Sequence, residues 1–298
     1  MKYLHSIILA ATAAAVALAV VSCGNAEREI AIEHKSLADS SQYANLTLYV
    51  ELPSETKGAS GAIRSQLADV VYDRMSHLSF EDDEKAYAPF SGDAADTDAM
   101  LGYFCSQTMK VLEEMTDADV ASRNEYIAQD PEMTEEQKKE IMAEYPGWEY
   151  DYSIKKIVES PRYVVFLSQD YLYSGGAHGG IAGKGALTFD KEDGHLVEWF
   201  IKPGCLEEMQ PMLTAGLLDY YKECGTEMTG SELMDHLFLE EKIIPLPSWT
   251  PYPTEKGLVF TYQQYEIASY ADGMPSFTVS YDKIRPMLTD EALRLLEL

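Results

Sequence analysis

The residues best suited to chemistry lie in one glycine-rich stretch, Tyr171 to Asp190. It holds a single histidine, His178, and six glycines between two segments with the alternation of β-strands. It lacks the Lys-Ser/Thr pair and the following helix of a phosphate-binding loop. Ser174 and His178 are four residues apart in an extended segment, which does not place them as nucleophile and base. The glycines are explained by backbone geometry between strands, and a loop held by rigid strands is also a common recognition element.

A second segment, Tyr262 to Tyr270, is rich in tyrosine and is also suited to recognition. Tyrosine combines an apolar ring with a polar hydroxyl, and it is common both in cores and in binding surfaces. We predict a binding surface that joins the two segments. Its candidate residues are Gly175, Gly176, His178, Gly179, Tyr262, Tyr265 and Glu266. An alternative is a cell-wall-acting hydrolase or deacetylase-like enzyme in which His178 and Glu266 meet in a cleft as acid and base.

The histidines and cysteines do not follow a metal-binding pattern. None of the six histidines is paired at a ligand spacing, so the sequence predicts no metal and no cofactor. Cys205 and Cys224 bracket a predicted helix, and a continuous helix would hold them too far apart for a disulfide. We therefore expect Cys105, Cys205 and Cys224 to be buried free thiols.

The N-terminus has the pattern of a bacterial lipoprotein signal. Lys2 precedes the apolar segment from Ile7 to Val21, which is too short to span a bilayer comfortably and is followed by Ser22 and Cys23. We expect residues 1–22 to be removed and Cys23 to be lipidated, so that the chain is held in the bacterial cell envelope through lipid alone. The polar residues that follow, to about position 40, are predicted to form a tether.

The charge of the chain limits its partners. The 298 residues include 23 Lys and Arg and 50 Asp and Glu, a net charge of −27. This charge argues against nucleic acid as a partner, because binding to phosphates requires a basic surface. A basic protein is favoured instead, since opposite charge accelerates encounter.

The order of the predicted elements indicates an α+β fold. A strand with alternating leucines (45–52) is followed by three helices (about 60–78, 101–115 and 134–145). Antiparallel strands are then expected near 148–158, 163–173 and 185–200, followed by helices near 204–223 and 231–239, strands at 257–262 and 275–281, and a last helix at 290–296. Helices and strands in blocks predict antiparallel sheets with helices packed on them. We divide them into two closely associated subdomains, 41–190 and 191–298.

Two motifs about 85 residues apart resemble a known pair of envelope domains. The first is Tyr173-Ser174-Gly175-Gly176-Ala177-His178-Gly179, followed by Leu187-Thr188-Phe189-Asp190. The second is Gly257-Leu258-Val259-Phe260-Thr261-Tyr262, with Tyr265-Glu266-Ile267-Ala268 and then Ser280-Tyr281-Asp282-Lys283-Ile284. The pair is similar to the extracytoplasmic part of lysozyme-sensing anti-sigma factors and to the non-catalytic region of some peptidoglycan deacetylases.

The resemblance implies an α+β envelope module that binds a lysozyme-like protein or cell-wall glycan (peptidoglycan). The segment between Asp190 and Leu196 departs from the family pattern, with Glu192-Asp193-Gly194-His195 in place of the expected Thr-Gly turn. The sequence shows neither a cytoplasmic anti-sigma segment nor a deacetylase domain, so those activities are not carried over. A third hypothesis is a structural protein of an envelope assembly, for which a large exposed apolar patch is expected.

Overall fold

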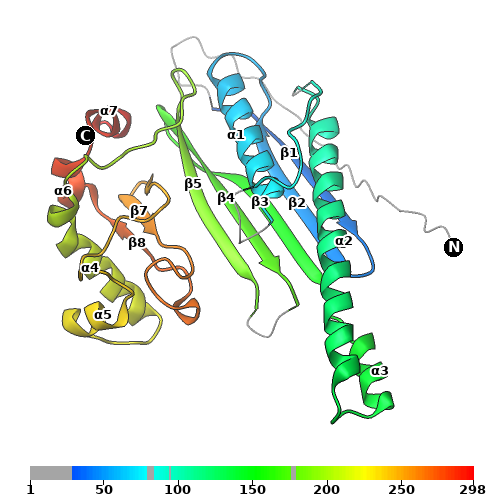
Figure 1. The fold of residues 1–298 in the computed structure, drawn as a ribbon. Helices are drawn as coiled ribbons and strands as arrows, with labels where there is room; N and C mark the ends of the chain where they lie inside the picture. The colour runs from blue at the N-terminus through cyan, green and yellow to red at the C-terminus, as the bar shows by residue number, and fades with distance from the viewer. Residues whose placement is uncertain (1–28, 79–83, 94, 176–178) are drawn as a thin grey trace.

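A computed structural model describes residues 29–78, 84–93, 95–175 and 179–298. Its larger lobe is a five-stranded sheet of order β1-β2-β3-β4-β5 (Figure 1). The strands are β1 (Ile32–Ser40), β2 (Ala44–Pro53), β3 (Trp148–Glu159), β4 (Tyr163–Tyr173) and β5 (Ile181–Asp190). All neighbours are antiparallel except β2 and β3. The parallel pair follows from the long helical connection between these two strands, because parallel strands need such a crossover.

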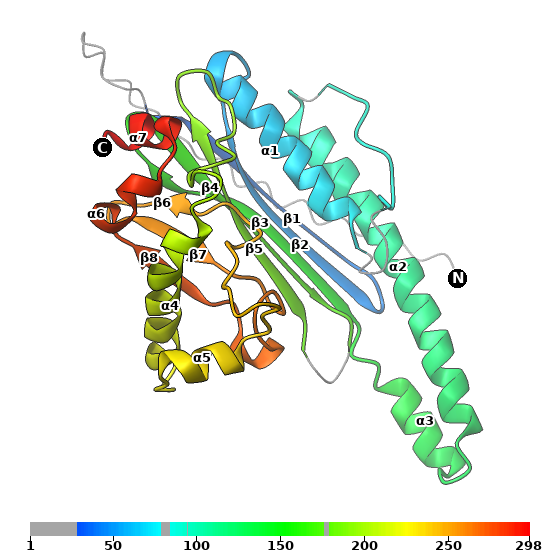
Figure 2. The ribbon, with the colours of Figure 1, turned by 60° about the vertical axis from the view of Figure 1, so that its left-hand side comes forward.

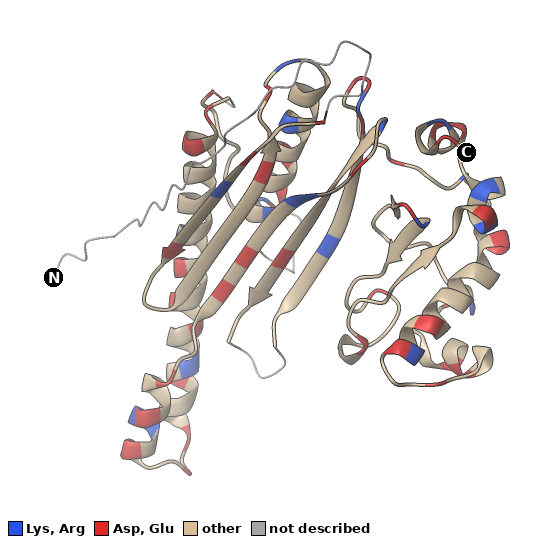
Figure 3. Ribbon diagram, turned by 180° about the vertical axis from the view of Figure 1, so that it is seen from behind, with Lys and Arg blue, Asp and Glu red and all other residues tan. Residues whose placement is uncertain are grey.

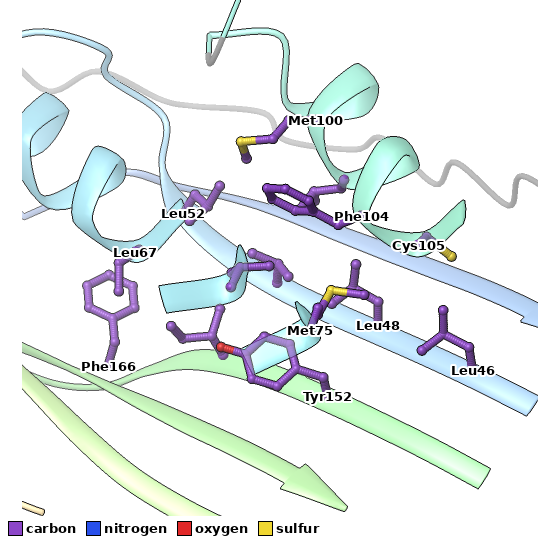
Figure 4. Packing of buried hydrophobic residues seen from close by; sticks show 14 of the residues in the cluster. Leu46, Leu48, Leu52, Leu67, Met75, Met100, Phe104, Cys105, Tyr152 and Phe166 are labelled. Carbon is purple, nitrogen blue, oxygen red and sulfur yellow. The ribbon is translucent and has the colours of Figure 1, made fainter. Parts of the chain in front are cut away.

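Two helices cover one face of this sheet. They are α1 (Gly58–Ser76) and α2 (Thr97–Gln129). The alternating leucines of β2 point at them, and Leu48, Met75 and Phe104 meet in the core shown in Figure 4. The second half of α2 extends past the sheet and, with α3 (Glu135–Ala143), forms a projecting hairpin (Figures 1 and 2). We call residues 117–145 the arm; of its side chains only that of Ile127 is buried.

The expected tether is shorter than the sequence indicated. Ile32–Ser40 forms the edge strand β1, paired over its whole length with β2. Its side chains alternate, with Leu37 opposite Leu48 on the helix-covered side. The polar composition concealed this strand, because an edge strand with one solvated face needs few apolar residues.

The smaller lobe packs against β4 and β5 (Figure 2). Its helices are α4 (Leu206–Glu223), α5 (Gly230–His236), α6 (Tyr281–Ile284) and α7 (Asp290–Leu296), with 3-10 turns at Tyr270–Asp272 and Arg285–Met287. Its antiparallel sheet comprises β6 (Tyr252–Pro253), β7 (Leu258–Thr261) and β8 (Ser276–Val279). Strand β4 contributes to both lobes because its successive side chains point to opposite faces of the sheet. Phe166 belongs to the core under α1 and α2, and Val165 belongs to the core of the smaller lobe.

The architecture confirms the predicted α+β class, with one mixed sheet and one antiparallel sheet. Within the described residues, no helix has the length and apolar character needed to cross a membrane. The three cysteines of this part of the chain are free thiols, as predicted. The expectation that all are buried was wrong: Cys105 is buried, Cys205 is partly accessible and Cys224 is exposed.

Candidate functional site

Two glutamines fasten the tyrosine-rich segment to the edge of the large sheet. The side-chain oxygen of Gln263 accepts the Lys184 N–H at 2.8 Å, and its amide donates to the Lys184 carbonyl at 2.8 Å. Gln264 accepts the Ala182 N–H at 2.8 Å. These bonds satisfy outward-facing backbone groups of β5, which would otherwise form an open sheet edge. They also place the second sequence motif directly beside the first.

Tyr270 joins the same segment to the glycine loop. Its hydroxyl donates to the Gly180 carbonyl at 2.8 Å. A Cβ atom at Gly179 would lie 2.8 Å from this hydroxyl, so glycine is required for the approach. Tyr265 lies against Tyr270 with ring centroids 5.8 Å apart, and 57% of its surface is exposed. An aromatic pair, with Tyr265 exposed and Tyr270 half-buried, therefore lies beside the loop.

The loop itself departs from strand geometry at its two described ends. Gly175 and Gly179 have φ of +77° and +82°, the left-handed region that favours glycine. Gly176 and His178, both predicted to take part in binding, lie outside the described residues. We call Gly175, Gly179, Tyr265 and Tyr270 the loop–tyrosine surface. Tyr270 ends the segment predicted to take part in binding but was not singled out as a candidate residue.

Two predicted binding residues have structural roles. Tyr262 is fully buried, and its hydroxyl donates to the Pro245 carbonyl at 2.7 Å, so it is not part of the loop–tyrosine surface. Glu266 accepts the Ser248 N–H at 2.5 Å with one carboxylate oxygen and the Gln263 N–H at 2.7 Å with the other. This carboxylate therefore shapes the turn that presents Tyr265. The acid–base hypothesis also needs His178, which the structure does not describe.

An apolar groove lies on another part of the junction between the lobes. A cavity of about 440 Å³ is lined by residues 196–201 and 246–251 together with Ala186 and Leu187 of β5. Trp199 is 66% exposed at this groove. Trp249 is half-buried: its ring covers Gly185, where a Cβ atom would lie 2.0 Å from it, and Arg74 stacks on it at 4.7 Å from the ring centroid. Trp249 is thus a fixed wall, and Trp199 is accessible.

A histidine and two carboxylates form a network where β5 ends. His195 contacts Asp193 through Nδ1 at 2.6 Å and Glu291 of α7 through Nε2 at 2.5 Å. These bonds, chiefly that to Asp193, raise the pKa of His195 above its ordinary value. Asp190, Asp193 and His195 are close enough to hold a metal, but Asp190 is paired with Arg294. The arrangement is satisfied as an ion-pair network that holds α7. Glu291 and Arg294 lie about 100 residues from the other members, so spacing alone did not reveal the network.

Asp170 is a partly buried carboxyl that the sequence reasoning missed. Burial raises its pKa, and the nearby guanidinium of Arg74 opposes that effect only in part. A Cβ atom at Gly183 would lie 2.5 Å from the Asp170 carboxylate, so this glycine makes room for it. The alternation of β4 could have identified it, since Asp170 follows Phe166 on the helix-covered side. Asp170 does not line the apolar groove.

The face of the large sheet away from α1 and α2, which the smaller lobe covers at β4 and β5, is polar and acidic near the arm. Figure 3 shows this face, away from α1 and α2. Glu149 is exposed and Asp151 half-exposed on β3. The arm adds nine acidic and three basic residues. The acidic character of the chain is therefore pronounced at the end of the sheet that carries the glycine loop.

Part of the chain matches a known family model. Residues 201–282 match a family model described as "Protein of unknown function (DUF3298)". The match covers most of the smaller lobe, including the segment with Gln263, Gln264, Tyr265 and Tyr270. The comparison with curated proteins gave no match.

Two solved structures share the fold. A member of the DUF3298 family from Bacteroides fragilis has a TM-score of 0.60 at 14% identity, covering 90% of this chain and 97% of that one. A DUF3298 family protein from Pseudomonas aeruginosa has a TM-score of 0.52 at 12% identity, covering 88% and 96%. Residues 201–282 thus match the DUF3298 model, and the fold of the whole chain is similar to that of two bacterial proteins of that family.

Proposed function

We propose that the protein is a lipid-anchored binding module of the bacterial cell envelope and that the loop–tyrosine surface contacts its partner. The observation that carries this proposal is the convergence of the two sequence motifs. Hydrogen bonds from Gln263, Gln264 and Tyr270 hold the tyrosine-rich segment against β5 and the glycine loop. A rigid sheet edge that presents an exposed aromatic side chain, here that of Tyr265, is a typical recognition element.

The backbone of Tyr265 supports a binding role. Its φ is +64°, a left-handed conformation that costs a non-glycine residue about 1 kcal/mol or more. The strain is held by the Glu266 turn, and the Tyr265 side chain is largely solvent-exposed. Because such strain tends to occur at functional sites, we assign Tyr265 the central contact.

The charge favours a basic protein partner, and the sequence resemblance adds a lysozyme-like protein as the specific candidate. The net charge of −27 steers a cationic protein toward the acidic end of the sheet over long range. The test is a titration of lipid-free protein with lysozyme at low and moderate salt. We expect binding at micromolar concentration or below that weakens with salt. No binding at micromolar concentration at either salt would refute this partner.

A second candidate function, binding of cell-wall glycan, is favoured by the groove at Trp199 and Trp249. Its volume of about 440 Å³ suits a small ligand, and aromatic walls with few polar groups are usual in ligand sites. Soluble peptidoglycan fragments should change tryptophan fluorescence in the wild type and not in Trp199→Ala. An unchanged wild-type spectrum at millimolar fragment would exclude this candidate.

A further inference from the structure

The chain is fixed to the folded body from its second described residue onward. Ile30 is buried, its N–H donates to Glu159 Oε1 at 2.7 Å, and its carbonyl accepts from Lys156 at 3.2 Å. The next carbonyl, that of Ala31, accepts the Ser54 N–H at 2.8 Å. Only six residues, and so seven Cα–Cα steps, therefore separate Cys23 from Ile30, a fixed point on the fold. Fully extended, these seven steps reach about 25 Å.

This fixed point and the glycine loop lie at opposite ends of the large sheet. The strand register groups Ile32, Pro53 and Asp190 at one end. It groups Ser40, Tyr173 and Ile181 at the other. Strands of nine to twelve residues separate the two ends by roughly 30–40 Å.

Helix α2 extends this axis. It begins beside β1, where Thr97 donates to Glu33 at 2.6 Å and Lys35 pairs with Asp98 at 2.8 Å. Its 33 residues correspond to about 50 Å, and Figures 1 and 2 show it passing the loop end of the sheet. The tip of the arm is therefore the part of the described molecule most remote from Ile30 along this axis.

We infer that the Ile30 end of the fold is its membrane-facing surface, so that the loop–tyrosine surface and the arm point away from the phospholipid. This inference rests on the proposed lipidation of Cys23. The short connection limits how far the body can tilt or lift from the head groups. The loop–tyrosine surface is then presented to proteins approaching from the medium or periplasm.

The distribution of charge favours the same orientation. The cavity at the Ile30 end is lined by four acidic and four basic side chains, the basic ones being Lys57, Arg162, Lys191 and Arg294. The arm has nine acidic residues against three basic ones. Placing the arm on an anionic lipid surface would bring like charges within the screening length of about 10 Å at 0.1 M salt. The Ile30 end, whose cavity has equal numbers of acidic and basic side chains, meets no such repulsion.

Fluorescence quenching in vesicles tests the orientation. Lipidated full-length protein, with Cys205 and Cys224 changed to Ser, carries one added cysteine, either Lys57→Cys or Glu132→Cys. Both positions are exposed, at the Ile30 end and at the arm tip respectively. Maleimide labels the added thiol and spares Cys105, because burial raises the pKa of that thiol to about 11. Vesicles of phosphatidylethanolamine and phosphatidylglycerol carry an energy acceptor on their head groups.

We expect position 57 to lose most of its donor emission and position 132 to lose little. A variant with twenty Gly-Ser residues inserted after Gly24 should reduce this difference, because the body can then tumble. Equal loss at both positions, or a larger loss at 132, overturns the orientation. Flotation of the vesicles is measured first and tests the proposed anchor by itself. If the wild-type protein fails to float, as Cys23→Ser is expected to fail, the anchor is refuted and the orientation with it.

Discussion

Gln263→Ala tests whether the glutamine contacts couple the two lobes. The substitution removes two hydrogen bonds to Lys184, each 2.8 Å long. At about 1 kcal/mol net for each, the loss is about 2 kcal/mol, and more if the Lys184 groups stay unpaired. For a chain of this size that lowers Tm by about 4–6 °C. Gln264→Ala removes one bond and should cost about 1 kcal/mol.

Urea unfolding followed by circular dichroism gives the free energy of unfolding, and amide hydrogen exchange at Lys184 reports the contact directly. Gln129 is an exposed residue of α2, and Gln129→Ala is the matched control. Its free energy of unfolding should lie within about 0.5 kcal/mol of the wild-type value. Gln263→Glu retains the acceptor but sets a carboxylate oxygen against the Lys184 carbonyl, so it should not rescue stability. A loss below about 0.5 kcal/mol for Gln263→Ala, with unchanged exchange at Lys184, would refute the coupling.

Three further predictions follow from local geometry. The pKa of His195 is raised, so its ion pairs stabilise the fold fully below about pH 6.5, and this stabilisation is lost as pH rises through the folded-state pKa. The Tm difference between wild type and His195→Gln should therefore shrink from pH 6 to pH 9. A constant difference would contradict this. Gly185→Ala places a Cβ atom 2.0 Å from the Trp249 ring, so it should lower Tm and red-shift tryptophan emission; an unchanged spectrum and Tm would show that the ring is not held there. A thiol reagent at pH 7 should modify exposed Cys224 rapidly and spare Cys105 until the chain unfolds; equal rates would contradict the burial of Cys105.

Local periodicity was sufficient for most of the fold. The leucine alternation of β2 and the helical spacing in α1 identified elements that the structure contains. The edge strand β1 was missed because its side chains are mostly polar, and only pairing with β2 specifies it. The parallel β2–β3 pair depends on how the helical crossover packs, which residue patterns do not encode.

The candidate site was predictable only in part. The glycine and tyrosine motifs were singled out, and the structure brings their described residues together through Gln263, Gln264 and Tyr270. The roles of these three residues were not predicted, because a glutamine that completes a sheet edge looks like any polar loop residue in sequence. Burial of Tyr262 likewise depends on tertiary packing, since tyrosine suits cores and surfaces equally.

The measurement that tests the central claim most directly is calorimetric titration of lysozyme, the basic protein used as probe, into lipid-free wild type, Tyr265→Ala and Tyr126→Ala. Tyr126 is 77% exposed on α2 and provides a matched aromatic control. If the loop–tyrosine surface binds the partner, Tyr265→Ala should weaken the affinity at least tenfold, about 1.4 kcal/mol, and Tyr126→Ala should leave it unchanged. Equal affinities for wild type and Tyr265→Ala would contradict the claim.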